Sequence, residues 1–336
     1  MNRPGNPCAI RSAILLRAAA LLVALCGATP GHAAELPWPE RSVRLVVPSP
    51  GGSGIDVVAR VLAQRLTIEW GKPVIVDNRA GANSLIGAEA VARSAPDGHT
   101  LLFASDSTFT LNPHIYARLP YDPIADFRPV LQIVTFHQLL VAHPSLGVTT
   151  LAELIARAKA RPAAITYASW GAGSQGHLLS ELLKHRASID LLQVPYKGFA
   201  PAVAAVVAGE SMLTWAGIFS TQALVRAGRL KALGVAGPKR SVFLPEVPTF
   251  AELGMPEIDY TAWFGVFAPA GTSADLVARL SGDFAALLRD PEMRDKKLLP
   301  KAYEPSGIGP REFSALIVRE LAQRAAMVRI SGAVPQ

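Results

Sequence analysis

Short apolar runs alternate with longer segments of helical periodicity through the part of the chain that follows residue 40. The runs lie at residues 43–47, 73–76 and 100–104, and amphipathic patterns fill the gaps at 55–68 and 84–93. Short apolar runs are typical of buried strands, and apolar residues three and four positions apart are typical of a helix with one buried face. This βαβαβ order predicts a parallel sheet with helices on its faces and right-handed crossovers.

A second alternating series follows a predicted loop at 105–108 and two strand-like runs within 127–143. Its predicted helices are 151–160, 177–187, 201–207 and 220–227. Its predicted strands are 165–168, 191–194, 212–216 and 230–235. One more strand is expected at 263–268, and the tail from 274 to 330 is expected to be helical. Two such series predict two α/β lobes, each a mainly parallel sheet flanked by helices.

Open parallel sheets bind ligands beside the carboxyl ends of their strands. Two lobes whose strand ends face one another therefore predict a cleft between them. Segments 139–143 and 263–268 are the expected crossings between the lobes. The first lobe is then discontinuous, with residues 36–138 and 262–336, and the second lobe holds residues 139–261.

The first 33 residues have the pattern of a secretory signal peptide. Arg3, Arg11 and Arg17 form a positive region without an acid, and an apolar run and small residues follow it. We expect cleavage near Ala33 and Sec-dependent export to the periplasm. A lipoprotein anchor at Cys26 is disfavoured because Leu25 stands where a small residue is required.

Without this leader the mature chain has no cysteine, because both Cys8 and Cys26 lie in the leader. The leader arginines also contribute +3 to the formal net charge of +7, which leaves a mild net charge of +4 on the mature chain. The basic residues are scattered singly, a pattern that disfavours a nucleic-acid partner. We expect a monomer without a resident cofactor or metal.

Residues 49–54 read Ser-Pro-Gly-Gly-Ser-Gly between a strand and a helix. The first turn of a helix has backbone N–H groups without internal partners, and its dipole favours negative charge. Glycines remove the side chains that would keep a ligand from this backbone. The segment therefore indicates an anion-binding loop, with an ordinary βα turn as the alternative.

Residues 171–176, Gly-Ala-Gly-Ser-Gln-Gly, repeat this arrangement in the second series. The glycine spacing also matches a dinucleotide loop, with Asp190 at the distance expected of a ribose-binding acid.

Ser174 resembles an esterase nucleophile, but the only downstream histidines lie in the adjoining helix. His177, Glu181 and His185 share one helix face at a spacing that can hold zinc, or they are that helix's solvated face. We favour a second anion-binding loop.

Several segments together resemble one family, the Bug-type solute receptors of tripartite tricarboxylate transporters. The blocks are WPERSVRLVVPSPGGSGID (38–56), WGKPVIVDNRAGA, APDGHTLLFAS, LNPHIYARLPYDPIADF (111–127), YASWGAGSQGHL (167–178), VPYKG (194–198), VRAGRLKALGV (225–235), LPEVPTFAELG (244–254) and WFGVFAPAGT (263–272). The resemblance implies a type II periplasmic binding protein without catalysis, which closes on a small carboxylate and delivers it to the membrane permease subunits. A receptor that serves a sensor kinase, and an exported NAD-dependent or hydrolytic enzyme, are the alternatives.

The predicted ligand-binding residues lie in the strand-end loops of both series. They are Ser49, Gly51, Gly52, Ser53, Asp56, Ser105, Asp106, Ser107, Thr108, Ser169, Trp170, Gly171, Gly173, Ser174, His177, Tyr196, Lys197, Gly198, Trp215 and Ala216. Hydroxyls and backbone N–H groups replace the water that a buried carboxylate loses, without requiring a buried cation.

Two segments depart from the family pattern in ways that bear on the ligand. Trp215 and Ala216 stand where the family has Phe-Asp, and Asp106 stands where Asn is common. Loss of the acid at 216, with Trp170, Phe109 and Trp215 as flat apolar surface, predicts an aromatic or longer-chain acid. Asp106 is expected either to meet a ligand cation or to cap its turn.

Overall fold

The computed structural model describes residues 38–331, so the predicted leader, its cleavage at Ala33 and both cysteines lie outside the described residues. The chain divides into one unit up to Glu40 and a second, compact unit from Arg41 onward. Of the first unit only Trp38, Pro39 and Glu40 are described, with a cis peptide bond before Pro39. All that follows concerns the second unit.

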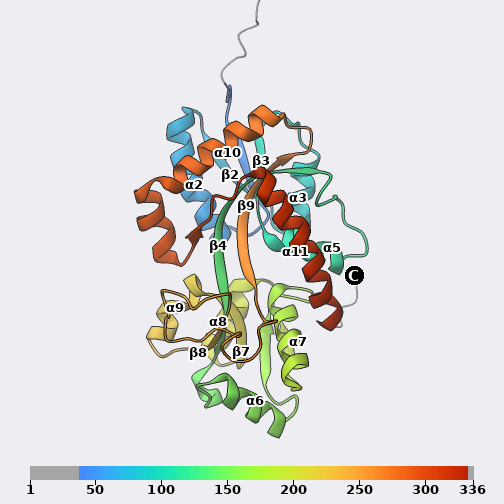
Figure 1. Cartoon of the computed structure of the whole chain (residues 1–336), viewed down its shortest axis with the longest axis vertical. Coiled ribbons are helices and arrows are strands. Elements are labelled where there is room, and N and C mark those ends of the chain that lie inside the picture. Colours follow the sequence, from blue (N-terminus) through green and yellow to red (C-terminus); the bar gives the residue numbers. More distant parts are fainter. Residues whose placement is uncertain (1–37, 332–336) are drawn as a thin grey trace, which may run out of the picture. The chain divides into compact units, whose positions relative to one another are not determined.

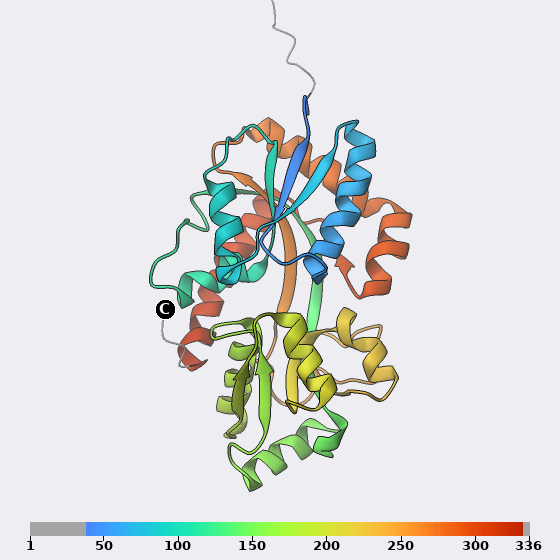
Figure 2. The same cartoon turned by 180° about the vertical axis from the view of Figure 1, so that it is seen from behind.

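The first sheet has the predicted parallel strands. These are β1 (Val43–Val47), β2 (Val74–Asn78) and β3 (Thr100–Ser105). β1 lies between β2 and β3 and pairs with both in parallel, so the loops that follow the three strands leave the same edge. Its main helices are α2 (Gly54–Trp70), α3 (Leu85–Ala92), α10 (Ala274–Arg289) and α11 (Pro310–Ser331). Figure 2 shows this sheet with α2 beside it.

Two long antiparallel strands link this sheet to the second one. β4 (Phe127–Ala142) pairs with β9 (Thr261–Pro269) along residues 127–137, and β9 pairs with β3. From Gln138 onward β4 pairs with strands of the second sheet instead. In Figure 1, β4 and β9 run lengthwise through the unit, from the region of α2 and α10 toward that of α7, α8 and α9.

The second sheet has the strands of the second predicted series. These are β5 (Thr166–Ser169), β6 (Leu192–Pro195), β7 (Leu213–Gly217) and β8 (Lys231–Ala236). β5 pairs in parallel with β6 and β7, and β7 and β8 are antiparallel to β4. The helices are α6 (Leu151–Ala160), α7 (Gln175–Ala187), α8 (Phe199–Ala208) and α9 (Ile218–Arg226). The architecture is thus the predicted two-lobed α/β fold.

Each lobe is closed by its own apolar cluster. In the first lobe the rings of Phe109 and Phe267 stack at 3.9 Å, and Trp263 and Phe313 pack beside them. In the second lobe Leu139 of β4 packs with residues of β5, β8, α8 and α9, and Ala302 joins this cluster. Each sheet thus has an apolar cluster beside it, and β4 and β9 run between the two sheets.

Three predictions of local structure were wrong. Residues 127–142 form one strand, not two runs. Residues after Ser105 begin a short helix, α4 (Asp106–Thr110), because the chain turns at once at the end of β3. The tail is not helical throughout: a π-helical segment (Glu292–Leu298), a 3-10 turn (Leu299–Lys301) and strand β10 (Glu304–Pro305) separate α10 from α11. Prolines at 291, 300 and 305 interrupt α-helical hydrogen bonding there.

The predicted lobe boundaries stay predictions. Pairing along β4 changes partner between His137, which pairs with Thr261, and Gln138, which pairs with Gly217. The expected crossing at 139–143 therefore belongs to a longer strand that takes part in both sheets. Among residues 38–331, no helix has the length and apolarity needed to span a membrane.

Candidate binding site

The loop between β1 and α2 is held by a buried carboxylate. Asp56 is 1% exposed and accepts hydrogen bonds from the Gly52 N–H (2.8 Å), Arg60 Nε (2.9 Å) and Asn78 Nδ2 (2.9 Å). Burial raises the pKa of Asp56, but the hydrogen bonds from Arg60, Gly52 and Asn78 outweigh it and hold the pKa below its usual value. In the described structure the carboxylate oxygens of Asp56 bind the loop, Arg60 and Asn78, so they shape the loop, and a ligand contact of Asp56 stays a prediction.

The rest of this loop presents backbone and hydroxyl groups. Gly51 and Gly52 are exposed, and Gly52 has φ +80°, which favours glycine. Ser49 Oγ donates to Ser53 Oγ at 3.0 Å. Ser53 is the N-cap residue of the 17-residue helix α2, yet its side chain forms no capping hydrogen bond in the described structure. The first turn of α2 therefore keeps its N–H groups uncapped by that side chain.

The loop between β5 and α7 is braced by Ser174 and His177. Ser174 Oγ donates to the Gly171 carbonyl (2.6 Å) and caps α7, and the Gly173 N–H donates to His177 Nδ1 (3.0 Å). Burial lowers the pKa of His177, which keeps the ring neutral and its Nδ1 an acceptor. Both side chains thus position the loop. The described residues contain no group of three His, Cys, Asp or Glu side chains arranged for a metal ion.

The loop after β6 lies beside this one because β5 and β6 are neighbours. The Tyr196 N–H donates to the Ser169 carbonyl at 2.8 Å. Ser169 is fully buried and its Oγ accepts from Gln193 Nε2, so that hydroxyl is already engaged. Trp170 is half-buried, Lys197 is exposed, and Gly198 has φ +117°.

Asp106 is engaged inside the first lobe, and its contact with a ligand cation stays a prediction. Its carboxylate is 2% exposed and accepts a hydrogen bond from the Tyr260 hydroxyl at 2.5 Å. The Arg324 guanidinium lies over the Tyr260 ring at 3.6 Å, and Trp263 Nε1 donates to Glu320 at 2.8 Å. Burial raises the pKa of Asp106, and burial followed by the charge of Asp106 raises the pKa of Glu320 to about 7. Asp106 is therefore part of a buried polar cluster that fastens α4 to α11 and β9.

Three residues from the two segments that depart from the family pattern are also buried in cores. Trp215 is fully buried and its Nε1 donates to Ser180 Oγ at 3.1 Å. Ala216 is fully buried opposite Leu139, and Phe109 belongs to the first core. All five residues of β7 are buried, and Phe109 and Trp215 are both fully buried, so neither ring offers an exposed face in the described structure; the flat ligand surface that they were expected to form stays a prediction. Ser105 and Ser107 are half-buried, and Thr108 is buried.

The two glycine loops touch the opposite lobe. A Cβ built at Gly173 would lie 2.5 Å from Cγ2 of Ile115, which belongs to α5 (Asn112–Ile115) of the first lobe. A Cβ built at Gly54 would lie 2.6 Å from Cζ of Phe219 in α9 of the second lobe, and would overlap the Tyr303 hydroxyl. The lobes therefore meet through the strand-end loops that the sequence singles out.

Among the buried polar atoms without hydrogen-bond partners in the described structure, three belong to residues in or beside the glycine loops. Gln138 Nε2 of β4 donates to Gln175 Oε1 of α7 at 2.9 Å. In the described structure the remaining amide atoms of this pair, Gln138 Oε1 and Gln175 Nε2, have no partner, nor do Thr108 Oγ1 and Tyr303 Oη. Buried polar groups are normally satisfied, so such atoms are available to a ligand. Gln138 and Tyr303 were missed because no local motif surrounds them, and Gln175 was missed although it lies within the motif at 171–176, because the prediction there rested on the glycines, Ser174 and the histidines.

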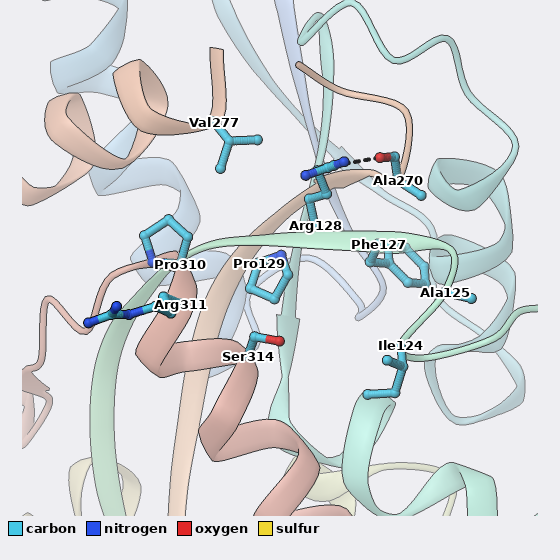
Figure 3. Close-up of a pocket in the computed structure, with 10 residues that line it drawn as sticks. All are labelled: Ile124, Ala125, Phe127, Arg128, Pro129, Ala270, Val277, Pro310, Arg311 and Ser314. Carbon is cyan, nitrogen blue, oxygen red and sulfur yellow. Dashed lines mark hydrogen bonds between the residues drawn. The ribbon is translucent and has the colours of Figure 1, made fainter. Parts of the chain in front are cut away.

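A separate pocket of about 400 Å³ lies on the first lobe, between the start of β4 and the start of α11 (Figure 3). Arg128 Nε donates to the Ala270 carbonyl at 2.6 Å in this pocket, and Arg311 and Phe127 also line it. Its lining residues, all within the described chain, include none of the predicted ligand-binding residues.

Two lobes joined by paired strands, with one glycine loop of each lobe in contact with the other lobe, define a two-lobed binding-protein fold. The family described as tripartite tricarboxylate transporter family receptor matches residues 58–332. Protein BugT of Bordetella pertussis is 35% identical over 95% of this chain and 98% of that protein. The chain belongs to this receptor family.

Solved structures of related proteins have the same fold as this chain. The structure of R. palustris Rpa4515 with adipate is 35% identical, with a TM-score of 0.83 over 89% of this chain and 100% of that one. MatC from Rhodopseudomonas palustris with bound malate is 30% identical, with a TM-score of 0.79 over 87% of this chain and 100% of that one. Small carboxylates are thus bound by two relatives whose whole length this chain covers.

Proposed function

We propose that this chain is a periplasmic receptor that captures a small organic carboxylate between its lobes and delivers it to the membrane permease of a tripartite tricarboxylate-type transporter. The ligand lies between the loops at 49–54 and 171–174, and residues 139–261 move as the second lobe. The protein performs no catalysis. The observation that carries this proposal is the contact of each glycine loop with the opposite lobe, at Gly54 and Gly173.

The donors around these loops suit a carboxylate. A buried carboxylate must replace its lost water hydrogen bonds. The uncapped first turn of α2 and the Gln175 Nε2 amide supply neutral donors, and neutral donors bind an anion without a buried counter-charge. The bound forms of two relatives, with adipate and with malate, support the same ligand class.

Closure explains how a permease can recognise the loaded receptor. A ligand that contacts both loops binds the closed arrangement more tightly than an open one, so it shifts the population toward closure. The paired strands β4 and β9 carry the connection, and a surface formed by both lobes changes when they move.

The test is a binding screen on the protein exported with its own leader from a Gram-negative host. We expect a periplasmic mature form beginning near Ala34, and saturable binding of at least one acid among adipate, malate, benzoate and terephthalate by calorimetry and thermal shift. Retention of the leader in the cytoplasm would refute the periplasmic assignment. Failure to bind any di- or monocarboxylate would refute the receptor assignment, and turnover of a bound acid would refute the absence of catalysis.

A further inference from the structure

Tyr303 is a tyrosine that the sequence did not single out and that reaches the region between the lobes. It follows the turn at Ala302, which has φ +55°, and it precedes β10, which pairs with β4 through Glu304 and Thr135. The ring is fully buried between Phe136 (5.5 Å between centroids) and Phe264 (5.7 Å). This packing fixes the direction of the hydroxyl.

The Tyr303 hydroxyl is buried and has no hydrogen-bond partner among the described residues. It lies against Gly54, the first residue of α2, where any side chain would overlap it. Burial raises the pKa of Tyr303, so the hydroxyl stays protonated and is a donor. A buried hydroxyl without a partner destabilises a protein, and its presence calls for an explanation.

Aromatic rings continue from Tyr303 into the second lobe. Phe219 stacks on Tyr303 with centroids 5.0 Å apart, Phe199 stacks on Phe219 at 6.3 Å, and Trp170 contacts Phe199 edge-on at 5.3 Å. We call Trp170, Phe199 and Phe219 the aromatic row. All three are only partly buried, unlike Trp215 and Phe109. The aromatic row therefore begins directly beside Tyr303, and each of its rings keeps part of its surface exposed.

We propose that the Tyr303 hydroxyl and the first turn of α2 together bind the ligand carboxylate, and that the aromatic row selects an acid with a flat apolar body, an aromatic carboxylate. The inference rests on the proposed receptor function and adds its ligand class. A flat ring buries its area against Phe219 and Phe199, whereas the hydroxyl of a short hydroxy acid such as malate meets no partner on these faces.

The test compares Tyr303→Phe with Tyr167→Phe as the matched control. Tyr167 is also buried, but its hydroxyl has a partner, because it donates to Glu181 at 2.7 Å. Tyr303→Phe is expected to raise the melting temperature of the ligand-free protein by about 2 °C and to weaken benzoate or terephthalate binding about tenfold or more, since hydrogen bonds to charged groups are strong. Tyr167→Phe is expected to lower the melting temperature and leave the Kd unchanged.

A second variant, Phe219→Leu, tests whether the aromatic row selects aromatic acids. We expect it to weaken benzoate and terephthalate binding at least fivefold while changing adipate binding less than twofold. Unchanged Kd values in Tyr303→Phe, for acids that the unmodified protein binds, would overturn the role of Tyr303. Equal effects of Phe219→Leu on all acids, or tighter binding of malate than of both aromatic acids, would overturn the ligand class. An unmodified protein that binds no carboxylate overturns the receptor function itself, and this inference with it.

Discussion

Substitution of Gly173 by alanine is a direct test of whether ligand binding requires the two lobes to meet. Gly173 has φ +71°, and its missing side chain makes room for Ile115 of the opposite lobe. An alanine Cβ would lie 2.5, 2.9 and 3.0 Å from three side-chain carbons of Ile115. Ile115 is 2% exposed, so it has little freedom to move aside.

The two effects of this substitution act on different states. The left-handed φ strains alanine by about 1–2 kcal/mol in any state, which lowers the melting temperature by a few degrees. The collision arises only while the lobes are together, since Gly173 and Ile115 belong to different lobes. Overpacking costs about 1–3 kcal/mol, and this corresponds to about 5- to 150-fold in Kd.

The assay is calorimetric titration with whichever carboxylate the unmodified protein binds, together with thermal unfolding. Gly228→Ala is the matched control, because Gly228 has φ +70° and no described atom lies within 4 Å of a Cβ there. It is expected to show the same loss of stability with an unchanged Kd. Ile115→Ala, although destabilising by itself, is expected to restore most of the affinity lost in Gly173→Ala. An unaltered Kd in Gly173→Ala, or no recovery in the double variant, would refute the reasoning.

Two further predictions concern buried carboxyl groups. Asp56→Asn removes the anion that orders the loop at 49–54 and should destabilise the protein by about 1–3 kcal/mol with weaker ligand binding. The folded-state pKa of Asp56 is lowered, so its carboxylate stabilises the protein above the unfolded-state pKa of about 3.9, and this stabilisation is lost as pH falls through the lower folded-state pKa. Urea unfolding at pH 7 and at pH 3 should therefore show a smaller difference in the free energy of unfolding between the unmodified protein and Asp56→Asn at the lower pH. Glu320 has a pKa raised to about 7 from 4.5, so the unfolded state ionises first and stability falls as pH rises from about 4.5 to 7, by up to about 3 kcal/mol. In Glu320→Gln this decrease in stability should disappear. The same change of melting temperature with pH in both proteins, from pH 5 to 7.5, would contradict the raised pKa of Glu320.

Local chemistry was enough to predict the alternation of strands and helices and both glycine loops. The strand at 43–47 and the helix at 151–160 have the predicted ends because an apolar run and an amphipathic period each depend on neighbouring residues alone. The loops at 49–54 and 171–176 follow for the same reason: glycine in the left-handed region and a helix start are encoded within six residues.

Tertiary structure alone decided which polar side chains are already engaged within the protein. Asp56, Asp106 and Trp215 look available in sequence, yet each is engaged by a partner that folding brings near, such as Tyr260, which lies 154 residues from Asp106. Tyr303 shows the reverse case, since its hydroxyl meets Gly54 only through the pairing of β10 with β4. The sequence by itself determined where backbone donors end a strand and begin a helix, because those depend on local conformation. Hydrogen-bond satisfaction and burial depend on packing between distant segments, and only the folded chain decided them.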